Sequence, residues 1–244
     1  KQLNIVWKIY KLRNNNIGTL FIVSTPIGNL EDITFRAIST LNSVSLIAAE
    51  DTRRSKVLLS RYTINTKMVS YFEHNKFQRI SQIEGILSDG KDVAVITDAG
   101  TPAISDPAYK LVRKAIEIGS RVEAVPGPSA VLAALVSSGL PTDRFLFEGF
   151  LPPKKGRKKR IENLTNIEGT VVIYENSNRL KRTVKQLHDI LGDRPAVLCR
   201  ELTKMYEEIV RGTLSSLLHI LENKTFKGEC VLLVSKDDKN IYFE

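Results

Sequence analysis

Three segments of the sequence combine proline and glycine with small polar residues in a pattern that suits ligand binding. They are 25–32 (TPIGNLED), 98–107 (DAGTPAISDP) and 126–130 (PGPSA), and each follows a short apolar run. Proline fixes the backbone φ angle and glycine permits close approach, so the segments predict stiff turns with accessible backbone. For a single turn, plain punctuation of a strand end is an equal alternative. Three such turns at one sheet edge favour binding.

The ligand class follows from what these turns lack. Neither G-x-G-x-x-G nor G-x-x-x-x-G-K-[ST] occurs in the chain, which argues against an ordinary dinucleotide site and against an NTPase. Carbonyl-rich turns near a carboxylate favour a ligand that has a positive centre and no phosphate chain. A sulfonium fits that description, although spacing alone does not establish it.

Acidic and basic side chains follow another apolar run. Glu50 and Asp51 precede Thr52, and Arg53 and Arg54 come directly after it. In a functional interpretation the arginines bind phosphates while a carboxylate orients or deprotonates a hydroxyl. In the structural alternative, Asp51 or Thr52 caps a helix, which is the interpretation we favour for this position, and the arginines are solvated. Capping does not exclude a second role.

The positive charge of the chain is concentrated in two places. Of the net charge of +9, residues 1–16 contribute +4, residues 17–150 are balanced, and residues 151–244 contribute +5. Within the last segment, six cations lie in seven residues, namely Lys154, Lys155, Arg157, Lys158, Lys159 and Arg160. Such a run of like charges is either a solvated loop or a binding site for a polyanion.

The elements that must position these residues alternate from Thr19 onward. Short apolar runs predict strands, and the intervening segments have helical period, so we expect an α/β unit with parallel strands and right-handed crossovers. The clearest helix begins at Pro107, is capped by Asp106 and ends at Gly119. The predicted strands are 19–24, 45–49, 68–71, 93–97, 121–125 and 144–148.

A length of 244 residues favours two units. The alternation breaks at Pro152, Pro153 and the basic run, which predicts a basic extension at 1–16, an N-terminal α/β domain at 17–150 and a smaller C-terminal α/β domain at 151–244. In the second domain we expect strands at 170–174, 196–200, 206–211 and 229–235, of mixed direction, and a helix closing at Gly192.

Several protein classes are excluded by composition. No apolar run reaches the roughly 18 residues that span a bilayer, and the charges scattered through residues 1–16 do not form an export signal. We therefore predict a cytoplasmic protein without a membrane partner. Cys199 and Cys230 lie in apolar runs and are expected to be reduced and buried. Three scattered histidines without a cysteine pair predict no metal site.

Six ordered motifs give the sequence a specific resemblance. They are GTLFIVSTPIGNLEDIT, IAAEDTRRS, TDAGTPAISDP, VPGPSAVLAAL, SGLPTDRFLFEGFLP and RELTK. From about Gly18 to Ser235 the chain resembles the bacterial 16S ribosomal RNA 2′-O-methyltransferases called small subunit methyltransferase I, a family of the tetrapyrrole methylase superfamily.

The resemblance implies two αβα domains with S-adenosylmethionine in the cleft between them, and usually a homodimer. The implied reaction transfers the sulfonium methyl group to the ribose 2′-hydroxyl of a cytidine in the decoding region of 16S rRNA, as free RNA or within the small ribosomal subunit. Gly28 and Asn29 would shape the cleft floor. Cofactor contacts would come from Asp98, Ala99, Gly100, Thr101, Pro102, Ile104, Pro126, Gly127, Ser129 and Ala130.

With this resemblance the residues take on expected roles. An alcohol that attacks a sulfonium methyl group needs placement more than strong acid-base help, and Glu50 and Asp51 are the candidate bases. RNA phosphates would be the partner of Lys154–Arg160 and of Arg53 and Arg54. Where relatives carry histidine in a Tyr-Glu-Ser-Pro-His-Arg motif this chain has Asn178, so no role of that histidine is carried over.

Two other functions compete with this interpretation. A methyltransferase that acts on a tetrapyrrole or another small molecule would not need a polybasic edge, which ranks it second. A noncatalytic RNA-binding relative would have no use for the cofactor loops, and the intact DAGTP and PGPSA motifs count against it. Titration with S-adenosylmethionine separates a methyltransferase, which binds the cofactor, from a noncatalytic relative, which does not.

Overall fold

The computed structural model describes residues 17–106, 108–238 and 240–243. The chain divides into two compact units, and the boundary between them lies between Ser129 and Ala130. The predicted extension at 1–16 and the predicted first helical residue Pro107 lie outside the described residues. Among the helices of the described residues, none has the length and apolar character needed to cross a membrane.

Unit 1 contains a parallel five-stranded sheet in the order β3-β2-β4-β1-β5, as the alternating pattern predicted. Parallel strands are buried on both faces, and the residues of β2 and β4 are accordingly all buried. The elements are β1 (Leu20–Val23), η1 (Leu30–Asp32), α2 (Phe35–Ser43), β2 (Leu46–Ala49), α3 (Thr52–Arg61), β3 (Met68–Ser70), α4 (Lys76–Ser88), β4 (Val93–Ile96), α5 (Ala108–Glu117) and β5 (Val122–Val125).

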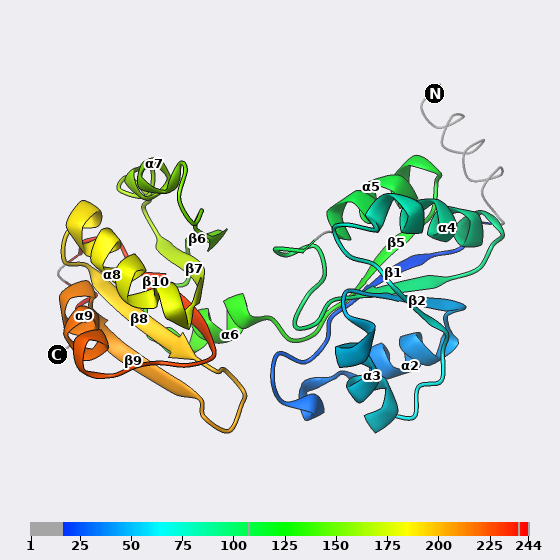
Figure 1. Ribbon diagram of the computed structural model, residues 1–244, viewed down its shortest axis with the longest axis horizontal. Helices are drawn as coiled ribbons and strands as arrows, with labels where there is room; N and C mark the ends of the chain where they lie inside the picture. Colours follow the sequence, from blue (N-terminus) through cyan, green and yellow to red (C-terminus); the bar gives the residue numbers. More distant parts are fainter. Residues whose placement is uncertain (1–16, 107, 239, 244) are drawn as a thin grey trace. The chain divides into compact units, whose positions relative to one another are not determined.

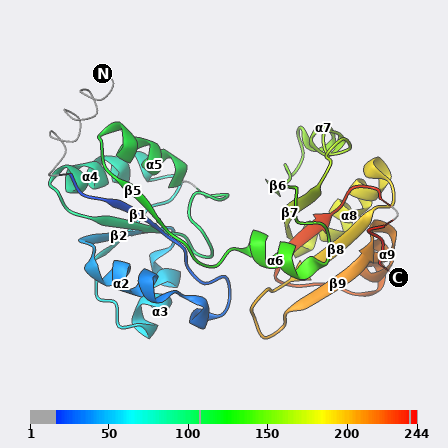
Figure 2. The same ribbon diagram turned by 180° about the vertical axis from the view of Figure 1, so that it is seen from behind.

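Helices cover both faces of this sheet (Figures 1 and 2). On one face, Leu41 of α2 and Leu58 of α3 pack in the cluster that includes Ile47. On the other face, Leu87 of α4 and Leu111 of α5 pack in a second cluster. Because every helix runs back from the carboxyl edge of the sheet, the loops that follow β1, β2, β4 and β5 all lie at that edge.

Unit 2 contains a second five-stranded sheet, in the order β6-β7-β10-β8-β9. Only β6 and β7 are parallel, and the other neighbours are antiparallel, so the predicted mixture of directions is confirmed. The elements are α6 (Ala130–Ser138), β6 (Phe145–Phe150), α7 (Arg157–Glu162), β7 (Thr170–Asn176), α8 (Ser177–Leu191), β8 (Pro195–Arg200), β9 (Glu208–Thr213), α9 (Leu214–Asn223) and β10 (Glu229–Val234).

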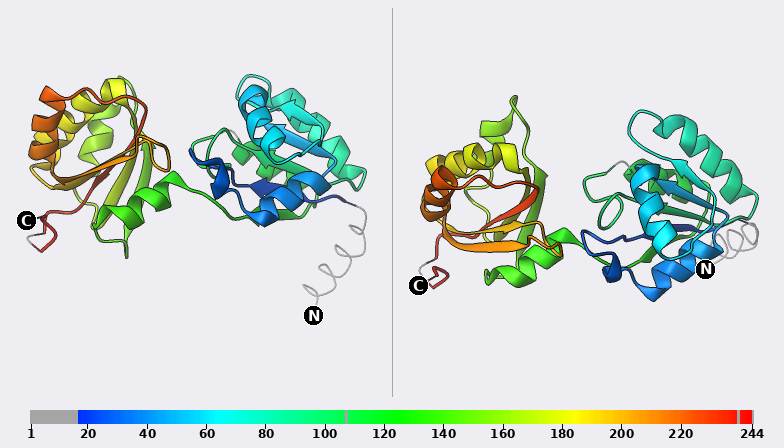
Figure 3. Two further views of the ribbon diagram at one scale, coloured as in Figure 1. Left: turned by 90° about the horizontal axis from the view of Figure 1, so that it is seen from below. Right: turned by 60° about the horizontal axis from the view of Figure 1, so that its bottom comes forward.

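The core of unit 2 lies between its sheet and two helices. Leu180 and Leu187 of α8 and Leu217 of α9 pack with Ile173 and Leu232 of the sheet. Helix α6 packs against β8 and β10 and lies on the opposite face of the sheet from α8 and α9 (Figure 3). Unit 2 is therefore also a three-layer αβα structure.

The predicted domain boundary at 150 is wrong. Helix α6 and strand β6 belong to unit 2, because α6 packs on its sheet and β6 pairs in parallel with β7. The strand predicted at 144–148 therefore does not join the first sheet. The Pro152-Pro153 break and the basic run connect two neighbouring strands of one sheet, and their composition resembles that of an interdomain linker only because the connection lies on the surface.

Candidate active site

The proline- and glycine-rich loops of unit 1 are joined to one another by hydrogen bonds. Thr25 and Gly100 exchange two backbone hydrogen bonds, of 2.9 and 3.0 Å, which tie the β1 loop to the β4 loop. Thr101 Oγ1 lies 3.0 Å from Ser24 Oγ and donates to the carbonyl of Pro128 at 3.3 Å, which adds the β5 loop. The structure thus brings together three loops that are separated by up to about a hundred residues in the chain.

Two glycines suit these loops for different reasons. A Cβ atom at Gly127 would lie 3.0 Å from the Cβ of Ser24, a tight contact that would require Ser24 to shift slightly. Gly100 has a φ of +85°, in the left-handed region that favours glycine. Both were predicted cofactor-binding positions; Gly127 is exposed, whereas Gly100 is buried with its backbone bonded to Thr25.

The loop between β4 and α5 is held in an unusual shape by one carboxylate. Ala103 and Ser105 have φ angles of 71° and 64°, which cost non-glycine residues about 1–3 kcal/mol each. The Asp106 carboxylate compensates by accepting hydrogen bonds from the Ala103 amide, at 2.8 and 2.9 Å, and from the Ala108 amide, at 2.8 Å. The predicted cap at Asp106 is confirmed, and its second function, which shapes the loop, was not predicted.

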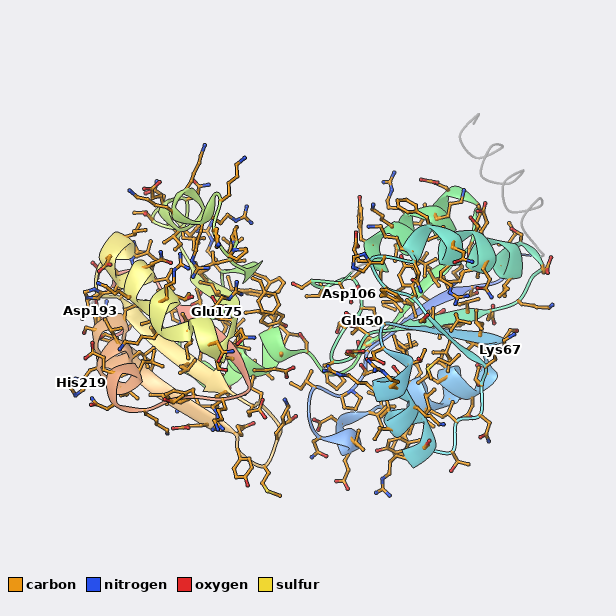
Figure 4. The ribbon with its side chains drawn as sticks, in the orientation of Figure 1. Glu50, Lys67, Asp106, Glu175, Asp193 and His219 are labelled. Carbon is orange, nitrogen blue, oxygen red and sulfur yellow. The ribbon has the colours of Figure 1, made fainter. Side chains whose placement is uncertain are left out.

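A group of carboxylates lies beside these loops. Thr97 Oγ1 donates to Glu50 Oε2 at 2.6 Å, and the Asp51 amide donates to Asp98 Oδ1 at 2.9 Å (Figure 4 labels Glu50 and Asp106). Burial raises the pKa of Asp98 and of Asp106, and the charge of Glu50 adds to both increases. Because these carboxylates repel one another, a positively charged ligand at this edge would be stabilised.

The two candidate bases differ in their surroundings. Asp51 is the N-cap of α3, and its Oδ1 accepts the Arg53 amide at 2.9 Å. The Arg53 guanidinium also bonds the Asp51 carboxylate, at 3.1 and 2.8 Å, and these hydrogen bonds lower the pKa of Asp51 to about 2. A carboxylate with so low a pKa is a weak proton acceptor, so Glu50 is the better candidate.

The predicted substrate contacts of unit 1 lie on its surface. Gly28 and Asn29 are exposed, and the Asn29 side chain caps η1 by accepting the Glu31 amide. Arg53 is paired with Asp51, as described above. Arg54 Nη1 lies 3.2 Å from Asp98 Oδ2, and its side chain is largely exposed. Both arginines are therefore placed at the candidate site by acidic partners.

The other predicted cofactor residues differ in exposure. Ala99, Ile104 and Pro126 are exposed, whereas Pro102 is buried. Ser129 is the last residue of unit 1 and Ala130 is the first residue of α6, at the boundary between the units.

The basic segment forms a turn and the short helix α7 in unit 2. Lys154, Lys155, Lys158 and Lys159 are exposed, as a polyanion-binding segment requires. Arg160 forms an ion pair with Glu148, and its side chain is half exposed. These five cations remain candidates for contact with a substrate.

Arg157 was predicted to bind substrate, and the structure contradicts this. Its side chain is 3% exposed and donates to Gln186 Oε1 at 2.7 Å, to the Pro152 carbonyl at 3.1 Å and to Thr183 Oγ1 at 2.6 Å. It also lies 3.6 Å from a carboxylate oxygen of Glu175, which is fully buried. Arg157 and Ile161 are four residues apart, so both lie on the inner face of α7. That spacing was the signal in the sequence.

Glu175 is a residue whose importance the sequence did not reveal. It ends the apolar run of β7, and its carboxylate also accepts Arg179 Nη2 at 2.7 Å and Thr183 Oγ1 at 2.6 Å. Asn176 caps α8 by accepting the amide of Asn178, at 3.0 Å. The segment that departs from the relatives' motif therefore begins a well-capped helix.

Comparisons with known proteins agree with this arrangement. A family model described as Tetrapyrrole (Corrin/Porphyrin) Methylases matches residues 19–218. A protein named ribosomal RNA small subunit methyltransferase I from Halalkalibacterium halodurans is 48% identical over 233 residues, covering 95% of this chain and 80% of that protein. The protein of the same name from Thermotoga maritima is 45% identical over 219 residues, covering 90% of this chain and 99% of that protein.

Solved structures show the same fold at low sequence identity. A cobalt precorrin-4 methyltransferase is 19% identical with a TM-score of 0.68, covering 89% of this chain and 94% of that chain. A diphthine synthase is 15% identical with a TM-score of 0.69, covering 90% of each chain. The chain therefore belongs to the tetrapyrrole methylase family and, within it, to the ribosomal RNA small subunit methyltransferase I proteins.

Proposed function

We propose that this protein is an S-adenosylmethionine-dependent rRNA methyltransferase that methylates the ribose 2′-hydroxyl of a cytidine in the decoding region of 16S rRNA. The observation that carries the proposal is the junction of the three loops at one sheet edge, in a chain 48% identical to a ribosomal RNA small subunit methyltransferase I. The cytidine and the 2′-oxygen come from the resemblance of the motifs. An enzyme with this substrate acts in the cytoplasm, where ribosomes are assembled.

The edge of unit 1 fits a cofactor with a sulfonium centre. Burial raises the pKa of Asp98 and of Asp106, and the nearby charge of Glu50 raises both further. A cationic ligand bound beside these carboxylates would favour their charged form. Gly127 is exposed and offers backbone without a side chain, and the partly exposed Thr101 offers a hydroxyl group. We infer that residues 98–104 and 126–130 hold S-adenosylmethionine. When bound, the cofactor supplies an activated methyl group and leaves as a neutral thioether.

Glu50 is the residue that we expect to act on the ribose hydroxyl. Both hydrogen bonds that fix its carboxylate, from Thr97 Oγ1 at 2.6 Å and from the Asp98 amide at 3.4 Å, reach Oε2. The carboxylate is thereby held at the edge where the methyl donor would bind. There it can orient the hydroxyl and accept its proton, which typically contributes about 10²-fold or more to the rate.

The substitution Glu50→Gln tests this role, because it preserves the shape of the side chain and removes its charge. We expect kcat to fall about 10²-fold, and cofactor affinity to fall by a smaller factor because the carboxylates of Asp98 and Asp106 remain. Glu117→Gln, an exposed residue at the end of α5, is the matched control. Turnover equal to that of the control would remove Glu50 from the reaction.

The activity itself is tested with methyl-labelled S-adenosylmethionine and small ribosomal subunits that lack the modification. We expect label at one cytidine and resistance of that position to alkaline cleavage, which requires a free 2′-hydroxyl. Label on a base of the RNA would refute the proposal. Transfer of label to an added tetrapyrrole, with none to RNA, would also refute it. Absence of any cofactor binding by calorimetry would indicate a noncatalytic RNA-binding protein.

We also infer that the protein is a homodimer, as the resemblance implies. Sedimentation equilibrium checks this directly: a mass near twice 27.4 kDa is expected, and a monomer at micromolar concentration would contradict it.

A further inference from the structure

Much of the positive charge outside residues 1–16 is concentrated in one stretch of unit 2. Residues 154–185 hold ten lysines and arginines but three acidic residues, which accounts for +7 of the total +9. This stretch includes α7, β7 and most of α8. The basic run noticed in the sequence is thus one part of a larger cationic region.

Helix α7 packs directly on α8, so the two parts of this region are neighbours (Figure 1). Arg157 joins them: it reaches Thr183 Oγ1 at 2.6 Å and Gln186 Oε1 at 2.7 Å, both on α8. Arg179, Thr183 and Gln186 lie at positions i, i+4 and i+7, on the face of α8 turned toward α7. Arg182 flanks that face and is exposed, and its charge lies close enough to affect the pKa of Arg157.

The exposed cations on α7, on the turn before it and on α8 differ in their partners. Arg160 is paired with Glu148, Arg179 with Glu175, and Lys185 with Asp189. By contrast, within the described part of the chain no ion pair neutralises Lys154, Lys155, Lys159 or Arg182. Lys158 is 81% exposed and reaches Glu162 only at 3.7 Å, so it too is available to a partner.

We propose that Lys154, Lys155, Lys158 and Lys159 together with Arg182 form one binding surface for an RNA backbone, and that buried Arg157 is its positioning residue. We call these five cations the α7–α8 surface. The inference rests on the proposed function and goes beyond it by adding a residue of α8 and by removing Arg157 from contact with RNA.

The geometry explains why the buried positioning residue, Arg157, has to be an arginine. Its planar fork donates in several directions at once, to α8 and to the turn before α7, so it fixes the rotation of α7. With Arg157 and Ile161 turned inward, the lysines of the same helix are turned outward. Repulsion among the lysines is relieved when phosphates bind, which releases counterions and makes binding depend on salt.

The test measures the affinity for a fragment of small-subunit RNA at several salt concentrations. Log K falls as log salt rises, so the slope is negative. We expect Arg182→Gln to make this slope less steep by about 1. The fourfold variant, in which Lys154, Lys155, Lys158 and Lys159 are replaced by glutamine, should make it less steep by about 3. The matched control is Lys67→Gln, an exposed lysine directly before β3, at the opposite edge of unit 1 from Glu50 (Figure 4). It should leave the slope unchanged.

Arg157→Gln tests the positioning role. A variant that merely lost part of its folded population would bind less RNA but keep the slope, whereas a misplaced α7 loses several phosphate contacts together. We therefore expect the slope to become less steep by more than 1, although Arg157 itself touches no phosphate. Rescue of the slope by Arg157→Lys would contradict the requirement for the planar fork.

The outcomes separate this inference from the proposed function. If Arg182→Gln and Lys67→Gln have equal slopes while the wild-type protein methylates RNA, the α7–α8 surface is wrong and the function stands. If the wild-type protein binds S-adenosylmethionine but transfers no methyl group to RNA, the function itself fails. If the fourfold lysine variant loses binding to anionic vesicles but binds RNA as the wild-type protein does, the surface binds a membrane and the inference is overturned.

Discussion

Replacing Arg157 by methionine should be among the most destabilising single changes in unit 2. The guanidinium is 3% exposed, makes three side-chain hydrogen bonds and lies 3.6 Å from the fully buried Glu175 carboxylate. Removing one partner of a buried ion pair costs about 3–5 kcal/mol, because the other charge stays buried. Glu175 keeps Arg179 Nη2 at 2.7 Å, so we expect the lower end, about 3 kcal/mol.

Urea unfolding followed by circular dichroism measures this loss. With a slope of about 2 kcal/mol per M, the midpoint of the transition should move down by about 1.5 M. Lys158→Met is the matched control, since Lys158 is the next residue, is 81% exposed and has only a distant partner. It should change the free energy of unfolding by less than about 1 kcal/mol. Equal midpoints for the two variants would refute the buried anchor.

Three further predictions concern other sites. Asp106→Ala should free Ala103 from its left-handed conformation and weaken S-adenosylmethionine binding at least about tenfold by calorimetry; unchanged affinity would contradict the role of the loop. Because the pKa of Asp51 is lowered to about 2, its carboxylate stabilises the native state above its ordinary pKa, and this contribution is lost as pH falls toward 2. Between pH 5 and 2, Asp51→Asn should therefore lose less melting temperature than the wild type, and identical acid profiles would count against it. Burial raises the pKa of Cys199 to about 12 and of Cys230 to about 11, so neither thiol should be alkylated at pH 8 until urea unfolds the protein; rapid reaction of the native protein would disprove this.

Local features of the sequence predicted much of the fold because they depend on neighbouring residues. The all-apolar strands β2 and β4 could be read from short runs, and the caps at Asp51 and Asp106 from residue type and position. The predicted carboxyl edge also held, since in a parallel sheet every loop that follows a strand emerges at the same side.

Nonlocal features were missed. Strand β6 was predicted as a strand but assigned to the wrong sheet, because its partner β7 is recognised only once both are folded. Ala103 and Ser105 adopt the left-handed conformation although neither is a glycine, so the sequence does not indicate it. The Asp106 carboxylate imposes this conformation.

The sequence alone determined the family, the alternation of strands and helices, and the loops that we propose hold the methyl donor, because turn chemistry and hydrophobic periodicity act over a few residues. Only the tertiary structure decided which cations of the basic run remain in water. The spacing of Arg157 and Ile161 hints at an inner face of this helix, but only the packing of α7 on α8 turns Arg157 toward Glu175 and leaves the neighbouring cations exposed. The direction of a side chain depends on the surface against which its helix packs, and that surface is formed by residues distant in the chain.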